Sequence, residues 1–150
     1  MENSQLPALD KLMPPVMPSQ KAYQFILDPF VGKFIDPDDD EVVYKAGVLL
    51  EGIPLDRFRT AWLESTQGQY FLLHHDYNHF RFPELQKFML KNEVVWAPVI
   101  KLYGNRGALQ FEDGRHRFLW LSIHGYETFS ACVAKHEETR IRERLGMLPR

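Results

Sequence analysis

Residues 108–125 read ALQFEDGRHRFLWLSIHG, and most of the fold prediction rests on them. They predict a strand over Ala108–Phe111, a break at Asp113-Gly114 and a helix from Arg115 to His124, with Gly125 as its C-cap. After its first turn the helix is apolar on almost every side, which is typical of a helix buried in a core. We therefore expect a strand that leads directly into a central helix.

Basic residues occupy the first turn of this predicted helix. Arg115, His116 and Arg117 lie at the positive end of the helix dipole, where unpaired N–H groups bind anions and phosphate above all. Gly114 lets a ligand approach the backbone because it has no Cβ. The arginines add fork-shaped donors for phosphate oxygens, and His116 can donate to phosphate or transfer a proton near neutral pH. The turn therefore predicts a phosphate site.

Two acidic residues, Glu112 and Asp113, immediately precede this turn. They are candidate ligands for a Mg²⁺ ion that bridges phosphates, and with His116 they are the candidate catalytic residues. A simpler interpretation is that Asp113 caps the helix and the arginines form salt bridges. The residue types alone leave both interpretations open.

The rest of the chain mixes short strands and helices, which predicts an α+β fold. Further strands are expected at Val42–Leu50, Tyr70–Leu73, Val99–Tyr103 and Thr128–Val133. Helices are expected from Pro54 to about Ser65, at Pro83–Lys91 and at Glu137–Leu145. Gly68 is expected to end the first helical region, and Gly104–Gly107 to form a hairpin turn.

Apolar residues at helical or strand spacing define the expected core. Leu85, Phe88 and Met89 form the buried side of the helix that begins near Pro83. Trp96 and Cys132 are expected in the core as well, because a free cysteine in an apolar run behaves as a small hydrophobe.

A length of 150 residues is usual for one domain. Residues 1–20 carry four prolines and are expected to form an extended N-terminal arm, and residues 21–150 the single folded domain. The acidic run Asp36–Asp40 predicts a solvated turn, because it lacks the alternating ligands and the glycine of a calcium loop.

The formal net charge of −2 argues against a protein that coats nucleic acid by its overall charge, although it is compatible with a local basic patch. A single cysteine excludes a disulfide within the chain. No apolar run approaches the ~20 residues of a membrane span, and the N-terminus lacks a signal-peptide pattern. We therefore expect a cytoplasmic protein, which can still act at a membrane complex.

Two polar segments each allow more than one interpretation. The segment His74–His79 contains His74, His75, Asp76 and His79, and it predicts either an exposed polar loop, a loop that contacts a bound nucleotide, or a metal site without a recognised spacing. In the C-terminal helix, Glu138 and Arg142 form a favourable i, i+4 pair, which favours a solvated helix over one that contacts a phosphate backbone.

The segment Ala97-Pro98-Val99-Ile100, the strand end Leu109-Gln110-Phe111 and the turn Glu112–Arg117 together resemble the ParB/sulfiredoxin-like superfamily. There, a Pro-Val/Ile strand leads through a hairpin to an Asp-Gly-x-His-Arg turn that opens a helix and binds nucleotide phosphate. Gly125-Tyr126 and Phe129 continue the resemblance. It implies a ParB/sulfiredoxin-like domain, with a small mixed sheet flanked by helices.

Within this superfamily, the block Phe111–Gly125 most resembles the plasmid fertility inhibition factors. Ala61-Trp62 and Tyr70-Phe71 are similar to upstream segments of that family, and the resemblance covers residues 42–135. It implies a protein that blocks transfer through a conjugation or type IV secretion apparatus. Mg²⁺-dependent ATPase and DNase activities are associated with the family.

The resemblance therefore makes Mg²⁺ and ATP or another nucleotide the expected cofactors. It makes DNA or a component of the transfer apparatus the expected partner. The alternative is a non-catalytic interaction protein that binds such a partner. The sequence argues against sulfinic acid repair, because that activity needs a cysteine in the turn and this chain has Arg115 at that position. Operator binding in the manner of full-length ParB is argued against because too few residues follow the domain to form a helix-turn-helix.

Overall fold

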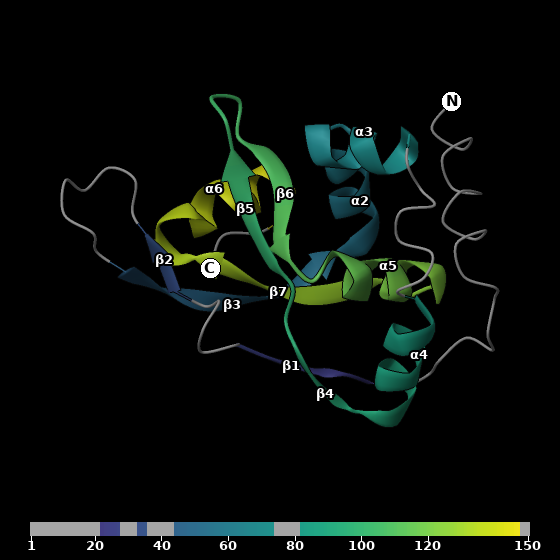
Figure 1. Cartoon of the computed structure of the whole chain (residues 1–150). Coiled ribbons are helices and arrows are strands. Elements are labelled where there is room, and N and C mark those ends of the chain that lie inside the picture. Colours follow the sequence, from purple (N-terminus) through teal and green to yellow (C-terminus); the bar gives the residue numbers. More distant parts are fainter. Residues whose placement is uncertain (1–21, 28–32, 36–43, 74–81, 148–150) are drawn as a thin grey trace.

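Figure 1 shows the computed structural model, in which residues 22–27, 33–35, 44–73 and 82–147 are described. These residues form two sheets and several helices, so the predicted α+β class is confirmed. The expected N-terminal arm, the acidic turn at 36–40 and the segment His74–His79 lie outside the described residues.

The larger sheet has five strands in the order β2-β3-β7-β5-β6. The strands are β2 (Lys33–Ile35), β3 (Tyr44–Pro54), β5 (Val99–Tyr103), β6 (Ala108–Asp113) and β7 (Thr128–Ala134). Neighbours pair antiparallel except β5 and β7, which are parallel with Val99 opposite Cys132. The sheet is therefore mixed, and Cys132 is buried at its parallel pairing, as expected.

Helices cover this sheet, and a second, smaller sheet lies below it in the view of Figure 1. The helices are α2 (Leu55–Leu63), α3 (Thr66–Leu73), α4 (Phe82–Lys91), α5 (Arg115–Ile123) and α6 (Glu138–Arg144), the last after a 3-10 turn at Lys135–Glu137. The smaller sheet pairs β1 (Gln24–Ile26) in parallel with β4 (Val94–Trp96). The sequence analysis did not anticipate β1, β2 or β4.

An aromatic cluster holds α5 in the core. Phe118 lies 5.3 Å from Phe58, 5.2 Å from Phe111 and 5.2 Å from Phe129, measured between ring centroids. Tilted and edge-to-face ring pairs at these distances stabilise a core beyond the area they bury. The run Phe118–Leu121 is completely buried, so the prediction of a central helix is confirmed and the start of α5 is fixed relative to the sheet.

The segment Tyr70–Leu73 is helical, so its prediction as a strand is wrong. Gly68, expected to end a helical region, lies inside α3 instead. A Cβ at Gly68 would lie 2.1 Å from the carbonyl oxygen of Trp62, so the glycine permits α3 to pack against the end of α2. A short apolar run does not distinguish a strand from a helix by its pattern alone, and tertiary packing decides here.

Gln67, at the start of α3, covers the edge of strand β6. Its side-chain oxygen accepts a hydrogen bond from the Phe111 N–H at 2.8 Å, and its side-chain nitrogen donates to the Phe111 carbonyl at 3.0 Å. Its own N–H donates to the side chain of Gln110 at 2.8 Å. These hydrogen bonds pair the backbone N–H and carbonyl of Phe111 at the edge of the sheet, which would otherwise face solvent or pair with another strand.

Two residues expected in the core are exposed. Trp96 exposes 48% of its surface, because strand residues alternate between faces and Val95 occupies the inner face of β4. Phe88 exposes 44%, whereas its neighbour Met89 is fully buried. The prediction of a buried side is thus confirmed for Met89, and Leu85 packs partly buried against the core.

The turn between β6 and α5 is packed tightly against the start of β5. Gly114 has a positive φ of 87°, and a Cβ there would lie 2.7 Å from the Cα of Pro98. The Pro98 carbonyl accepts a hydrogen bond from the Cys132 N–H at 2.7 Å, so Pro98 is anchored to β7. The space beside Gly114 is thus filled by Pro98 rather than left for a ligand, and glycine is required here for packing.

We predict that Gly114→Ala destabilises the protein by about 2–5 kcal/mol, the sum of the strain of a left-handed alanine and the overlap with Pro98. Gly104→Ala is the matched control, because Gly104 also has a positive φ (73°) but a Cβ there would meet no atom within 4 Å. Urea denaturation should show a loss of only about 1–2 kcal/mol for the control. Equal losses in both variants would contradict the packing argument.

Candidate phosphate-binding turn

The candidate site begins where β6 passes into α5. Gly114 is the N-cap residue of α5, in the left-handed conformation and without a side chain to cap the helix. Its carbonyl accepts the first helical hydrogen bond, from the Phe118 N–H at 3.2 Å. By helical geometry the N–H groups of the first turn have no partner within the helix and are directed away from its N-terminal end. The idea that Asp113 is the capping residue is wrong.

Arg117 folds back over this turn. Its Nη2 lies 3.4 Å from Oδ2 of Asp113 and 2.7 Å from the position that a Cβ of Gly114 would take. Only 18% of its side chain is exposed. Its Nε atom is buried and has no hydrogen-bond partner within the part of the chain that the structure describes. Arg117 therefore brings a positive charge and an unsatisfied donor to the start of α5.

Arg115 and His116, the other two basic residues of the turn, are partly buried at the same helix start. The structure thus brings together four of the residues predicted to bind phosphate, from Gly114 to Arg117. The predicted contacts from His74, His75, Asp76 and His79 lie outside the described residues.

Glu112 is engaged by two residues of the neighbouring strand. The phenol of Tyr103 donates a hydrogen bond to its carboxylate, and Lys101 Nζ lies 3.7 Å from the same oxygen. The Lys101 ammonium also lies over the Tyr103 ring, 5.1 Å from its centroid. Burial, together with the hydrogen bond to Glu112 and the nearby negative charges, holds the pKa of Tyr103 well above its usual range, so the phenol stays protonated as a donor.

A β-bulge in β6 sets the orientation of the Glu112 side chain. Val99 is opposite Asp113 and Ile100 is opposite Phe111, which leaves Glu112 as the extra residue of β6. The sequence analysis missed Lys101 and Tyr103. Their spacing of two residues on the partner strand was an available signal, because it places both on one face of the hairpin.

The two carboxylates therefore have different partners. Glu112 is paired with Lys101 and Tyr103, and Asp113 with Arg117. Among the described residues, no three His, Cys, Asp or Glu side chains gather closely enough to hold a metal ion. Glu112 and Asp113 each contact a cation, so a metal ion that took both as ligands would have to displace Lys101 and Arg117.

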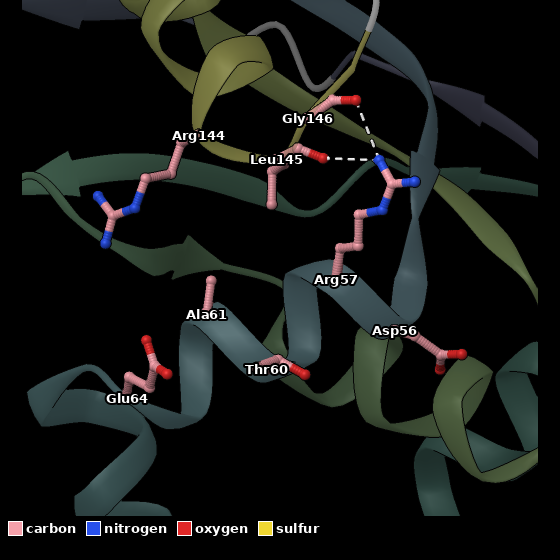
Figure 2. Close-up of a pocket in the computed structure, with 8 residues that line it drawn as sticks. All are labelled: Asp56, Arg57, Thr60, Ala61, Glu64, Arg144, Leu145 and Gly146. Carbon is pink, nitrogen blue, oxygen red and sulfur yellow. Dashed lines mark hydrogen bonds between the residues drawn. The ribbon is translucent and has the colours of Figure 1, made fainter.

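A hollow of about 580 Å³ lies elsewhere, between α2 and the end of α6 (Figure 2). None of the candidate catalytic, phosphate-binding or metal-binding residues predicted from the sequence lines it. Arg57 crosses it to donate hydrogen bonds to the carbonyls of Leu145 and Gly146, at 3.0 Å each. Those carbonyls follow the last turn of α6, so Arg57 satisfies groups that the helix end leaves unpaired.

His124 lies at the other end of α5, as its C-cap residue. Its Nδ1 is 2.9 Å from the Trp120 carbonyl, which can only accept, so Nδ1 carries the proton. Burial lowers the pKa of His124, and the hydrogen bond to Trp120 opposes that shift only in part. The imidazole is therefore neutral in the folded protein near pH 7.

The lowered pKa of His124 predicts that stability falls with acidification. The unfolded chain binds a proton near pH 6.5, whereas folded His124 resists it, so stability is lost as the pH drops below about 6.5. The loss is at most about 1.4 kcal/mol per pH unit. Urea denaturation between pH 7.5 and 5.5 should show a weaker pH dependence in His124→Gln. The exposed His136 gives the control, and His136→Gln should match the unaltered protein.

No protein-family model, curated protein or solved structure matches this chain. Within the described residues, no helix is both long and apolar enough to cross a membrane.

Proposed function

We propose that this chain binds the phosphate of a nucleotide or of DNA at the first turn of α5, and that it acts as an inhibition factor for conjugation or type IV secretion. The observation that carries the first part is Arg117. Its guanidinium is held over the helix start by one contact of 3.4 Å to Asp113, with a buried Nε that has no partner among the described residues.

A phosphate at this turn would satisfy several groups together. Its oxygens would accept from the first-turn N–H groups and from Arg117, and the helix dipole would favour its negative charge. A neutral ligand would leave the charge of the turn unbalanced. The overall charge of −2 supports a local contact with one or two phosphates rather than a long nucleic-acid surface.

We propose phosphate binding rather than phosphate hydrolysis at this turn. Hydrolysis of ATP or DNA by Glu112, Asp113 and His116 would require a carboxylate to leave its cationic partner. Mg²⁺ therefore enters only as the counter-ion of a bound nucleotide such as ATP. This supports a non-catalytic protein that inhibits through a bound partner over an Mg²⁺-dependent ATPase and DNase.

The inhibitory role rests on the resemblance of the block Phe111–Gly125 to the plasmid fertility inhibition factors. The fold expected from that resemblance, a ParB/sulfiredoxin-like domain, is supported by the order of elements: a Pro98-led strand, a hairpin, a Gly114 turn and a buried helix. The partner that we propose is a component of the transfer apparatus.

We predict that Arg117→Ala weakens the binding of ATP, CTP or their Mg²⁺ complexes by about ten- to a hundredfold, because one charge-assisted hydrogen-bonding group is lost. Isothermal titration measures this directly. Arg142→Ala is the matched control. Arg142 also follows its acidic partner, Glu138, by four residues, with an N–O distance of 3.1 Å and 17% of its side chain exposed.

Binding lost in Arg117→Ala and kept in Arg142→Ala supports the site. Equal weakening in the two variants, or tight binding that Arg117→Ala leaves unchanged, counts against it. Thermal melting of each variant establishes that the protein is folded before titration.

We also predict that expression of the chain in a donor cell lowers the frequency of plasmid transfer, and that Arg117→Ala restores transfer while Arg142→Ala does not. Counting transconjugants measures the effect. Unchanged transfer with the unaltered chain, at confirmed expression, would contradict the inhibitory role without bearing on phosphate binding.

A further inference from the structure

Trp96 is a half-exposed tryptophan on the segment that leads to the proposed phosphate site. It ends β4 and exposes 48% of its surface, whereas the other two tryptophans, Trp62 and Trp120, are completely buried. In Figure 1 the chain runs from β4 up to β5 and passes the point where β6 leads into α5. Trp96 lies two residues before Pro98, the residue that packs against Gly114.

The burial pattern of this segment indicates the direction of the Trp96 side chain. Trp96 is exposed and its neighbours Val95 and Ala97 are buried, so the side chains alternate as in an extended strand. Ala97 is also restricted to extended conformations because it precedes a proline. Alternation therefore places the side chains of Trp96 and Pro98 on the same side of the segment. The Cβ of Pro98 lies 2.9 Å from the position that a Cβ of Gly114 would take, so this side faces the turn.

The Arg117 guanidinium lies close to the same segment. Its Nη2 and the Cα of Pro98 are each 2.7 Å from the position that a Cβ of Gly114 would take, so these two atoms are at most twice that distance apart. Two extended residues span at most ~7 Å. The Cα of Trp96 is therefore no more than about 13 Å from the guanidinium, and the indole ring can lie closer.

An indole and a guanidinium at this separation match the two ends of one nucleotide, which joins a planar base to a phosphate through a ribose. Aromatic side chains beside a basic groove stack on nucleobases, and this stacking tolerates any base because every base has a π face. Ile26, which exposes 36% of its surface, lies beside Trp96 in the β1–β4 register and extends the apolar surface available to a base. A base inside a duplex is covered on both faces by its neighbours, so only an unpaired base can use this surface.

We propose that Trp96 stacks on the base of a nucleotide whose phosphate is held at the first turn of α5. This inference rests on the proposed phosphate site and narrows its ligand to nucleotides with an unpaired base. A free nucleotide and single-stranded DNA share this chemistry, and duplex DNA lacks it. Because stacking tolerates any base, the site discriminates little between ATP and CTP.

Isothermal titration with the Mg²⁺ complexes of ATP and of tripolyphosphate tests the stacking, because tripolyphosphate has the phosphates without the base. Trp96→Leu should weaken ATP binding by about five- to a hundredfold, the range that corresponds to the loss of one stacked base, and leave tripolyphosphate binding unchanged. Trp96→Phe keeps an aromatic ring and should retain most of the ATP affinity. Val94→Ala is the control, because Val94 is equally exposed on the same strand and should affect neither ligand.

Acrylamide quenching of tryptophan fluorescence gives a second measurement that needs no variant. Trp62 and Trp120 are buried, so the quenchable emission comes from Trp96. ATP should protect this emission from acrylamide, and tripolyphosphate should not.

An ATP affinity that Trp96→Leu leaves unchanged overturns the inference, and so does equal weakening of ATP and tripolyphosphate. Arg117→Ala distinguishes this failure from failure of the phosphate site, because it should weaken both ligands. If Arg117→Ala changes neither affinity, or if neither ligand binds, the phosphate site fails and the stacking inference fails with it. Thermal melting establishes that each variant is folded.

Oligonucleotides identify the source of the base. A single strand of about eight nucleotides is compared with a duplex of the same sequence. If DNA is the ligand, Trp96→Leu weakens binding of the single strand and leaves the duplex unchanged. Weakening of ATP binding alone identifies a free nucleotide as the ligand. Equal weakening of the single strand and the duplex contradicts stacking on an unpaired base.

Discussion

Pro98 lies so close to Gly114 that no side chain fits between them, and the arrangement of the last third of the chain depends on this contact. Pro98 is held by the N–H of Cys132 in β7, and Gly114 begins α5. The parallel pairing of β5 with β7 therefore fixes where the central helix starts. Phe118, one turn later, secures the helix among the core aromatics, so the basic residues of the first turn are held on a rigid support.

The electrostatics of the turn follow from that geometry. The β-bulge at Glu112 directs its carboxylate to Lys101 and Tyr103, whereas Asp113 reaches Arg117. Each acid is thus separated from the other and balanced by a cation. In the proposed site an anion would compete with Asp113 for Arg117, whereas a metal ion bound by both carboxylates would have to displace two cations. This is the physical reason for placing phosphate binding before phosphate hydrolysis.

Patterns local in sequence predicted the last third of the fold well. The hairpin, the break before α5, the buried helix and the Glu138–Arg142 pair follow from patterns within a few residues, whereas the packing of Pro98 against Gly114 does not. Long-range contacts were less predictable. Gly68 resembled a helix terminator but serves the packing of α3 on α2, and Trp96 resembled a core residue because nothing local showed which face β4 turns inward.

The most direct test of the central claim is a two-dimensional ¹H–¹⁵N NMR titration of the isotopically labelled protein with ATP. A phosphate at the start of α5 would perturb the backbone amides of Arg115, His116 and Arg117 first and most strongly, together with the Arg117 Nε–H. The account predicts that pattern, saturable and absent in Arg117→Ala. Perturbations confined to the hollow between α2 and α6, or none at high ATP concentration, would contradict it.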